Sequence, residues 1–180
     1  MDRLSRMPPL ANFLLYQLAW FACVMGAAKG QPMIGVGVAG LFIAWHLTLA
    51  RSAKSELAMI VLTGLIGGAW ETLIVHQDWV RYIGGTSPNW PPAWIIALWL
   101  AFATTFNVSL RWLQNRHGLA ALLGLLGGPA AWYAGARLGA LELPDPSVAL
   151  MVIGVGWAVL MPFLLFLAHR LATQQEGPHV

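Results

Sequence analysis

The sequence predicts an all-α membrane protein, a polytopic bundle of six transmembrane helices. Six long apolar stretches run along the chain, each near the ~17–25 residues that a helix needs to cross the hydrocarbon core of a bilayer. Among Asp, Glu, Lys and Arg, the six stretches together contain only Glu71. Charged residues make up 9% and hydrophobic residues 58% of the 180 residues, whereas a soluble domain has about 25% charged residues. So few charged residues cannot supply the polar surface that a water-soluble fold of this size needs.

The apolar stretches set the limits of the expected helices. These limits are 12–28, 34–50, 57–77, 93–110, 118–136 and 147–168. We expect a single transmembrane domain over 1–170 and a short polar cytoplasmic tail over 171–180. The first stretch follows Arg3 and Arg6 as a secretion signal would. However, it is longer than the 7–15-residue apolar region of a cleaved signal, so we interpret it as a retained helix.

Small residues mark the expected third helix as a packing element. Gly64, Gly67, Gly68 and Glu71 are spaced at offsets of 0, 3, 4 and 7, which places them on one helix face. In lipid the hydrophobic effect contributes little to the association of helices, so close packing has to stabilise helix pairs. Small residues allow the close backbone contact that such packing needs. The third helix should therefore be central and tightly packed.

The expected fourth and fifth helices follow the same reasoning. The fourth comes after a loop over 78–92 that is rich in Trp and Tyr, as is typical of the aromatic belt at a membrane surface. The fifth carries Gly124, Gly128 and Gly135 among other small residues. We expect the third and fifth helices to pack directly against each other through their small-residue faces. In the fifth and sixth helices, Pro129 and Pro162 would free backbone carbonyls that a neighbour must satisfy.

The distribution of Lys and Arg predicts the orientation in the membrane. With six crossings, one side carries Arg3, Arg6, Arg51, Lys54, Arg111, Arg116 and Arg170, and the other carries Lys29, Arg81 and Arg137. Cytoplasmic loops carry an excess of Lys and Arg. The count of seven against three therefore predicts that both termini are cytoplasmic.

Glu71 is the first candidate functional residue. It lies about six residues, or ~9 Å, from the outer end of its helix, at a depth where an acid is costly and marks a functional site by default. We expect the Glu71 carboxyl to face the interior, within reach of Arg137 or Tyr133, with His76 near the same boundary. Two interpretations stay open: a structural pair that fixes the helix arrangement, or an acid that takes part in catalysis or binding.

A second group of candidate binding residues lies toward the cytoplasmic side. It consists of His46, Asn107 and Arg111. Asn107 is more typical of an interhelical hydrogen bond than of a catalytic group. No helix carries paired His residues at ligand spacing, so we expect neither a metal nor another cofactor. The single cysteine, Cys23, excludes an internal disulfide. No motif points to nucleic acid.

Three strings carry a resemblance to a known family. They are NFLLYQLAWFACVMG at Asn12–Gly26, LWLAFATTFNVSLRWL within Trp94–Leu113, and GPAAWYAGARLGA at Gly128–Ala140. Over almost its whole length the chain resembles a family of uncharacterised small inner-membrane proteins of bacteria, known by a domain-of-unknown-function label. The resemblance implies a multi-pass protein of the bacterial inner membrane, associated with lipid-modification genes. The chain departs from the family pattern at Val108, where relatives often have His, and at Glu71, where they often have Asp.

Three functions remain open at this point. The first is a lipid-associated binding or accessory protein, with membrane lipid and lipid-modifying enzymes as partners. The second is a membrane-embedded enzyme that uses Glu71 as an acid or base while Arg137 holds a phosphate or carboxylate. The third is a small proton-coupled transporter that uses Glu71. A weak similarity between 64–68 and 124–128, at an offset of 60 residues, favours this third function. Whether the protein is an enzyme and how it assembles stay undetermined.

Overall fold

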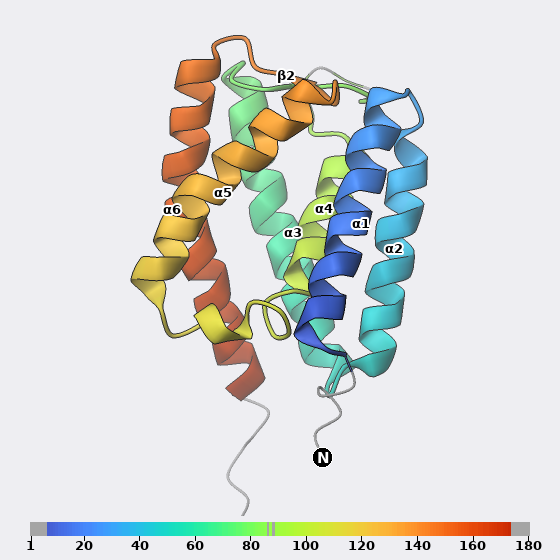
Figure 1. Ribbon diagram of the computed structural model, residues 1–180, viewed down its shortest axis with the longest axis vertical. Coiled ribbons are helices and arrows are strands. Elements are labelled where there is room, and N and C mark those ends of the chain that lie inside the picture. The colour runs from blue at the N-terminus through green and yellow to red at the C-terminus, as the bar shows by residue number, and fades with distance from the viewer. Residues whose placement is uncertain (1–6, 86, 88, 174–180) are drawn as a thin grey trace, which may run out of the picture.

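The computed structural model describes residues 7–85, 87 and 89–173, and six α-helices make up most of this part of the chain (Figure 1). The helices are α1 (Pro9–Ala28), α2 (Pro32–Leu49), α3 (Ala53–His76), α4 (Ala93–Ala103), α5 (His117–Arg137) and α6 (Pro146–Thr173). All of them except α4 are long and apolar enough to cross a membrane. The all-α membrane class is therefore confirmed. Arg3, Arg6 and the residues 174–180 of the expected tail lie outside the described residues.

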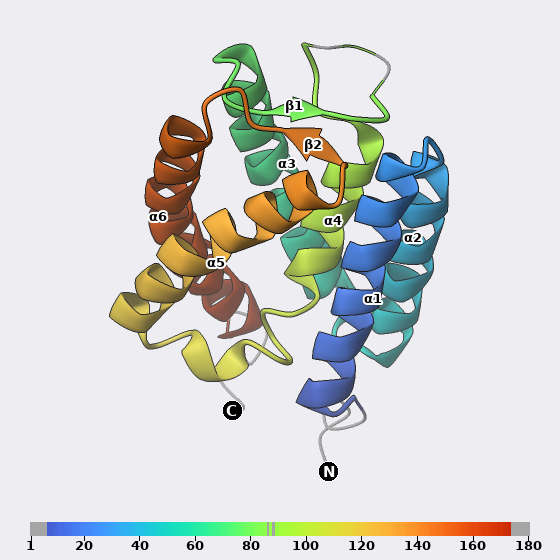
Figure 2. The same cartoon turned by 45° about the horizontal axis from the view of Figure 1, so that its top comes forward.

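The helices are arranged as two outer pairs around a central pair. The hairpin α1–α2 lies on one side and the hairpin α5–α6 on the other, with α3 and α4 between them (Figures 1 and 2). The first residues of α1 and the last residues of α6 lie at the same end of the bundle. That arrangement fits an even number of crossings, while the cytoplasmic placement of this end stays a prediction from the charge count.

The fourth helix is shorter than the sequence suggested. It ends at Ala103 instead of residue 110, and turns and the short 3-10 helix η2 (Arg111–Leu113) follow. Eleven helical residues span only ~16 Å, about half of a bilayer core. Two consecutive threonines begin the non-helical segment: the Thr104 and Thr105 hydroxyls donate hydrogen bonds to the carbonyls of Ala101 and Phe102. Such local side-chain bonds compete with helical ones.

The first residues of the non-helical segment, 104–108, are shielded from lipid. Thr104 and Phe106 are fully buried and Thr105 is 2% exposed. Irregular backbone at membrane depth is tolerated only where protein or a water-filled cavity surrounds it. Residues 104–108 meet this condition because they are buried in the bundle.

The expected contact between the third and fifth helices is wrong. The two helices do not pack against each other, since α3 packs mainly on α4 and α5 packs on α6. A Cβ atom on Gly67 would lie 2.1 Å from the Trp99 ring of α4, and one on Gly124 would lie 2.2 Å from the backbone oxygen of Trp157 in α6. The small residues do mark close approach, but to large side chains and backbone of other helices.

A close backbone contact also holds α1 against α2. A Cβ atom on Gly35 of α2 would lie 2.3 Å from the Cα atom of Cys23 in α1. The turn between these helices has Gly30 at a φ of 72°, a conformation that glycine adopts without strain. Pro32 then begins α2 at a position where its missing N–H costs nothing.

Gly35→Ala should destabilise the protein, whereas Gly37→Ala should not. Both substitutions gain helix propensity of about 1 kcal/mol, but a Cβ atom at Gly37 meets nothing within 4 Å. At Gly35 the overpacking against backbone should cost about 1–3 kcal/mol or more. Thermal unfolding of the purified protein in detergent should give a lower midpoint for Gly35→Ala than for Gly37→Ala. Equal midpoints would contradict the close contact of α1 with α2.

Candidate functional site

Two short strands connect the loops at the end of the bundle opposite the described chain ends. The strands β1 (Arg81–Tyr82) and β2 (Leu141–Glu142) are antiparallel, with Tyr82 opposite Leu141. Asp78, at a φ of 56°, accepts two hydrogen bonds from Arg81, at 2.6 and 2.7 Å. These exposed bonds hold the pKa of the Asp78 carboxyl below its ordinary value. The turn and the strand pair together fix the position of Tyr82 above α3.

Glu71 is the centre of a chain of hydrogen bonds that we call the carboxyl cluster. The Tyr82 hydroxyl donates to Glu71 Oε2, and the Trp99 indole Nε1 donates to Glu71 Oε1 at 2.8 Å. The Trp132 indole Nε1 in turn donates to the Tyr82 hydroxyl oxygen at 2.9 Å. Glu71 is fully buried. The carboxyl cluster therefore joins α3, β1, α4 and α5 through four side chains.

The Tyr82 hydroxyl is the link between the two halves of this cluster. Burial raises the pKa of the Tyr82 phenol well above its ordinary value, and the neighbouring Glu71 raises it further. Tyr82 therefore keeps its proton at physiological pH. A protonated phenol donates one hydrogen bond and still accepts others, which is the role that Tyr82 has between Glu71 and Trp132.

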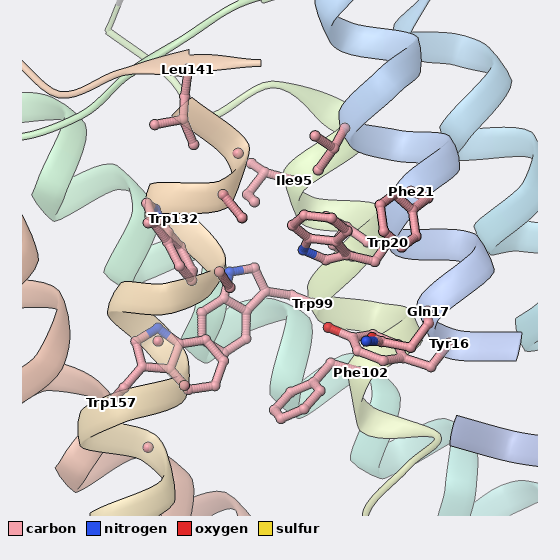
Figure 3. Close-up of a pocket in the computed structure, with 18 of the residues that line it drawn as sticks. Tyr16, Gln17, Trp20, Phe21, Ile95, Trp99, Phe102, Trp132, Leu141 and Trp157 are labelled. Atoms are coloured by element: carbon pink, nitrogen blue, oxygen red, sulfur yellow. The ribbon is translucent and has the colours of Figure 1, made fainter. Parts of the chain in front are cut away.

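A cavity of about 420 Å³ lies beside the carboxyl cluster (Figure 3). Its walls come from α1, α4, α5 and α6 and include Trp20, Phe102 and Trp157. Trp99 and Trp132 also line the cavity, whereas Glu71 and Tyr82 do not. Glu71 and Tyr82 are thus located behind the part of the cavity wall that Trp99 and Trp132 form. The volume falls within the ~300–1,000 Å³ of typical small-molecule sites.

Three indoles in contact with one another form one wall of the cavity. The Trp99 and Trp157 rings lie 5.0 Å apart at 21°, and the Trp132 and Trp157 rings lie 5.7 Å apart at 61°. Gly128 makes room for this arrangement, because a Cβ atom there would lie 2.6 Å from the Trp157 ring. The wall therefore depends on the carboxyl cluster for the orientation of Trp99 and Trp132, and on a glycine for the place of Trp157.

The cavity opens sideways between α1 and α5. These two helices lie on opposite sides of α4 (Figure 2) and do not pack against each other. Phe21 of α1 and Leu123 of α5 both line the cavity, and they are 50% and 40% exposed. In a chain whose long apolar helices cross a membrane, an opening on the side of the bundle lies next to the hydrocarbon.

The predicted partners of Glu71 are not the observed ones. Among the described residues, no hydrogen bond or ion pair joins Glu71 to Arg137 or Tyr133, and both of these side chains are exposed. Tyr133 follows Trp132 on α5, so it points about 100° away around the helix. His76 is also exposed, and its Nδ1 bonds the backbone oxygen of Thr72 at 2.9 Å. The inward orientation of Glu71 is as expected, but its partners come from elsewhere.

Sequence reasoning missed Tyr82 and Trp99 for different reasons. Tyr82 belongs to an aromatic loop that is typical of a membrane surface anchor, and only the strand pair turns it toward Glu71. Trp99 lies in a helix without polar residues, where a tryptophan signals ordinary core packing. A signal was nevertheless available, because a buried indole N–H usually has a hydrogen-bond acceptor, and Glu71 was the natural acceptor within these spans.

A second buried cluster lies at the other end of the bundle, and it includes two of the predicted residues. His46 Nε2 lies 3.0 Å from Glu56 Oε2, and Asn107 Nδ2 donates to Glu56 Oε1 at 2.7 Å. Gln114 Nε2 donates to Asn107 Oδ1 at 2.8 Å. Arg111 is exposed and does not join these residues. Glu56 was missed because it lies one residue before the expected third helix.

This second cluster stabilises the non-helical segment after α4. Gln114 Nε2 also donates to the Phe106 carbonyl at 3.1 Å, and Asn12 Nδ2 of α1 donates to the Thr104 carbonyl at 3.3 Å. Ser109 Oγ donates to Asn12 Oδ1 at 2.7 Å. Backbone groups freed by the end of α4 thereby gain partners, as the membrane environment requires. In the part of the chain that the structure describes, no three His, Cys, Asp or Glu side chains are grouped to hold a metal ion.

The fold and the cavity define a multi-pass α-helical membrane protein with a laterally open aromatic cavity. The chain belongs to the family described as protein of unknown function (DUF2878), whose model matches residues 9–163. This match contains the carboxyl cluster, the second cluster and every residue that lines the cavity. No curated protein and no solved structure matches the chain.

Glu71→Leu should destabilise the protein more than Glu71→Gln. Leucine would leave the Trp99 indole N–H and the Tyr82 hydroxyl without their acceptor, at a cost of about 1–3 kcal/mol for each buried group. The glutamine oxygen can still accept from Trp99, and its amide can donate to the Tyr82 oxygen. Thermal unfolding in detergent should therefore rank the midpoints as wild type, then Glu71→Gln, then Glu71→Leu. A Glu71→Leu protein as stable as wild type would show that these hydrogen bonds contribute little.

Proposed function

We propose that this protein binds a lipid chain in the cavity between α1 and α5 and holds it without reacting with it. The observation that carries this proposal is the apolar cavity of about 420 Å³ that opens sideways between spanning helices. A ligand that enters from the side must come from the bilayer itself, so it must be a lipid or a similarly apolar molecule. We further propose the bacterial inner membrane as the location, on the basis of the resemblance of the sequence.

The lining of the cavity suits a flexible apolar chain. Aromatic and aliphatic side chains dominate it, and glycines of α5 leave space on the side opposite α1. A lipid that moves from the bilayer into this cavity gains little from the hydrophobic effect, because both environments are apolar. Retention must therefore come from close packing against the indole wall, where many small dispersion contacts add up. A rigid aromatic wall provides such contacts at low entropic cost.

The positions of the acids favour binding over catalysis or proton-coupled transport. Both Glu71 oxygens accept hydrogen bonds, and Trp99 and Trp132 separate the carboxyl from the cavity. Arg137 is exposed and cannot hold an anionic group next to Glu71. Catalysis would need a nucleophile, acid or base within reach of the bound molecule. Glu71 instead has the geometry of a residue that positions the wall.

An accessory role follows from the lateral opening. A protein that holds a lipid chain at a side opening can receive it from the membrane and present it to a neighbouring protein. We therefore propose lipid-modifying enzymes as partners, in line with the gene association that the sequence resemblance implies. The cavity supports the lipid part of this proposal, and the partner part rests on the resemblance.

Gly127→Phe should abolish lipid retention, whereas Gly40→Phe should not. Gly127 lines the cavity and a Cβ atom there meets nothing within 4 Å, so phenylalanine can fill the opening without a clash. Gly40 of α2 is equally free of neighbours but lies outside the cavity. Native mass spectrometry of gently purified protein should show a lipid adduct for wild type and Gly40→Phe, and a several-fold weaker one for Gly127→Phe. Equal adducts in both variants, or none in wild type, would contradict the proposed function.

A further inference from the structure

We infer that the chain held in this cavity carries an uncharged oxygen, a hydroxyl or a carbonyl, and that this oxygen binds a polar face of α1 formed by Tyr16, Gln17 and Trp20. This inference rests on the proposed function and specifies the chemistry of the ligand. It follows from three features of the cavity: the orientation of the indole N–H groups, the unpaired groups of α1, and the lack of charge.

The walls formed by α4 and α5 turn their polar atoms away from the cavity. The indole Nε1 of Trp94 donates to the Ile83 carbonyl at 2.9 Å. The indole Nε1 of Trp99 donates to Glu71, and that of Trp132 donates to the Tyr82 hydroxyl oxygen. Trp157 of α6 stacks its ring against Trp99, and its Nε1 is buried without a hydrogen-bond partner among the described residues. Trp94, Trp99 and Trp132 therefore present ring surfaces to a ligand, and they contribute shape rather than hydrogen bonds.

The wall formed by α1 is different. Tyr16, Gln17 and Trp20 are spaced at offsets of 0, 1 and 4, which places them side by side on one helix face. All three line the cavity, and Figure 3 shows them projecting from α1 toward Trp99. Among the described residues, none of their side chains makes a hydrogen bond. Polar groups without partners are costly in hydrocarbon, so this face suits a ligand that can bond to it.

The side chains of Tyr16, Gln17 and Trp20 can all form a hydrogen bond with the same kind of ligand atom, an acceptor oxygen. The Trp20 indole is a donor only, while the Gln17 amide and the Tyr16 hydroxyl both donate and accept. An acceptor oxygen can therefore bond to any of them, and a hydroxyl can also donate to Gln17 or Tyr16. An apolar chain without oxygen would fill the cavity but leave this face unpaired.

The lack of charge in the lining restricts the ligand further. None of the described residues that line the cavity is Asp, Glu, Lys, Arg or His. An ionised carboxylate or phosphate held there would have no opposite charge, and burying an unpaired charge costs far more than burying a neutral polar group. Tyr16 and Gln17 also lie seven and eight residues into α1, at a depth of about 11 Å. The bound oxygen is thus neutral and lies well below the headgroups.

Photocrosslinking with three probes of equal chain length tests this inference. The probes carry the same diazirine at mid-chain and are a fatty alcohol, the corresponding hydrocarbon and the corresponding fatty acid in its ionised form. Wild-type protein in lipid nanodiscs should crosslink to the alcohol about two- to tenfold more than to the hydrocarbon, which is the gain from one neutral hydrogen bond. The ionised acid should crosslink to the cavity least.

Variants of the α1 face should remove this preference. In the triple variant Tyr16→Phe, Gln17→Leu and Trp20→Phe, the alcohol and the hydrocarbon should crosslink to similar extents, whereas Gln31→Leu, at the exposed turn before α2, should keep the wild-type preference. If wild type takes up the alcohol and the hydrocarbon equally, the inference is wrong while lipid binding stands. If the ionised acid crosslinks most, the inference that the bound oxygen is uncharged is wrong. If no probe crosslinks to the cavity in wild type, the proposed function itself fails. The comparison of the three probes in wild-type protein tests the inference even if a variant does not fold.

Discussion

In the hydrocarbon core of a bilayer no water is available, so a buried hydrogen-bonding group is costly unless it has a partner within the protein. This constraint accounts for both buried clusters. At one end, Glu71 is satisfied by Tyr82 and Trp99. At the other end, Glu56 links His46 to Asn107 beside the segment where α4 stops being helical. The short fourth helix is possible only because polar side chains and neighbouring helices satisfy the backbone groups that it leaves free.

The same constraint shapes the cavity. Trp99 and Trp132 each have an apolar ring and one polar atom, and the carboxyl cluster binds the polar atom on the side away from the cavity. The rings are thereby turned toward the space between α1 and α5. The buried acid Glu71 therefore has hydrogen bonds that support the proposed role of a residue that positions the wall. The α1 face is left with unpaired polar groups, and it is there that a ligand has hydrogen bonds to gain.

The sequence predicts the helices well because hydrophobic length is a direct signal of a spanning helix. Glycine spacing likewise predicts close approach at Gly67 and Gly124, but it carries no information on which helix approaches, so the expected pair was wrong. The end of α4 depends on Thr104 and Thr105, whose hydroxyls bond to nearby backbone carbonyls. These local hydrogen bonds outweigh helix formation only because the rest of the fold stabilises the non-helical backbone that follows. The partners of Glu71 were hidden because Tyr82 reaches it through a strand pair between distant loops.

The central claim is that the carboxyl cluster shapes the lipid-binding cavity, and lipid retention by Tyr82→Phe tests it most directly. This substitution removes the hydroxyl that links Glu71 to Trp132 but keeps the ring that packs against Trp94. The matched control is Tyr133→Phe, which changes an exposed tyrosine next to Trp132 in α5. Native mass spectrometry of both variants, each confirmed to be folded, should show a several-fold weaker lipid adduct for Tyr82→Phe and a wild-type adduct for Tyr133→Phe. A folded Tyr82→Phe protein that retains as much lipid as wild type would contradict the claim.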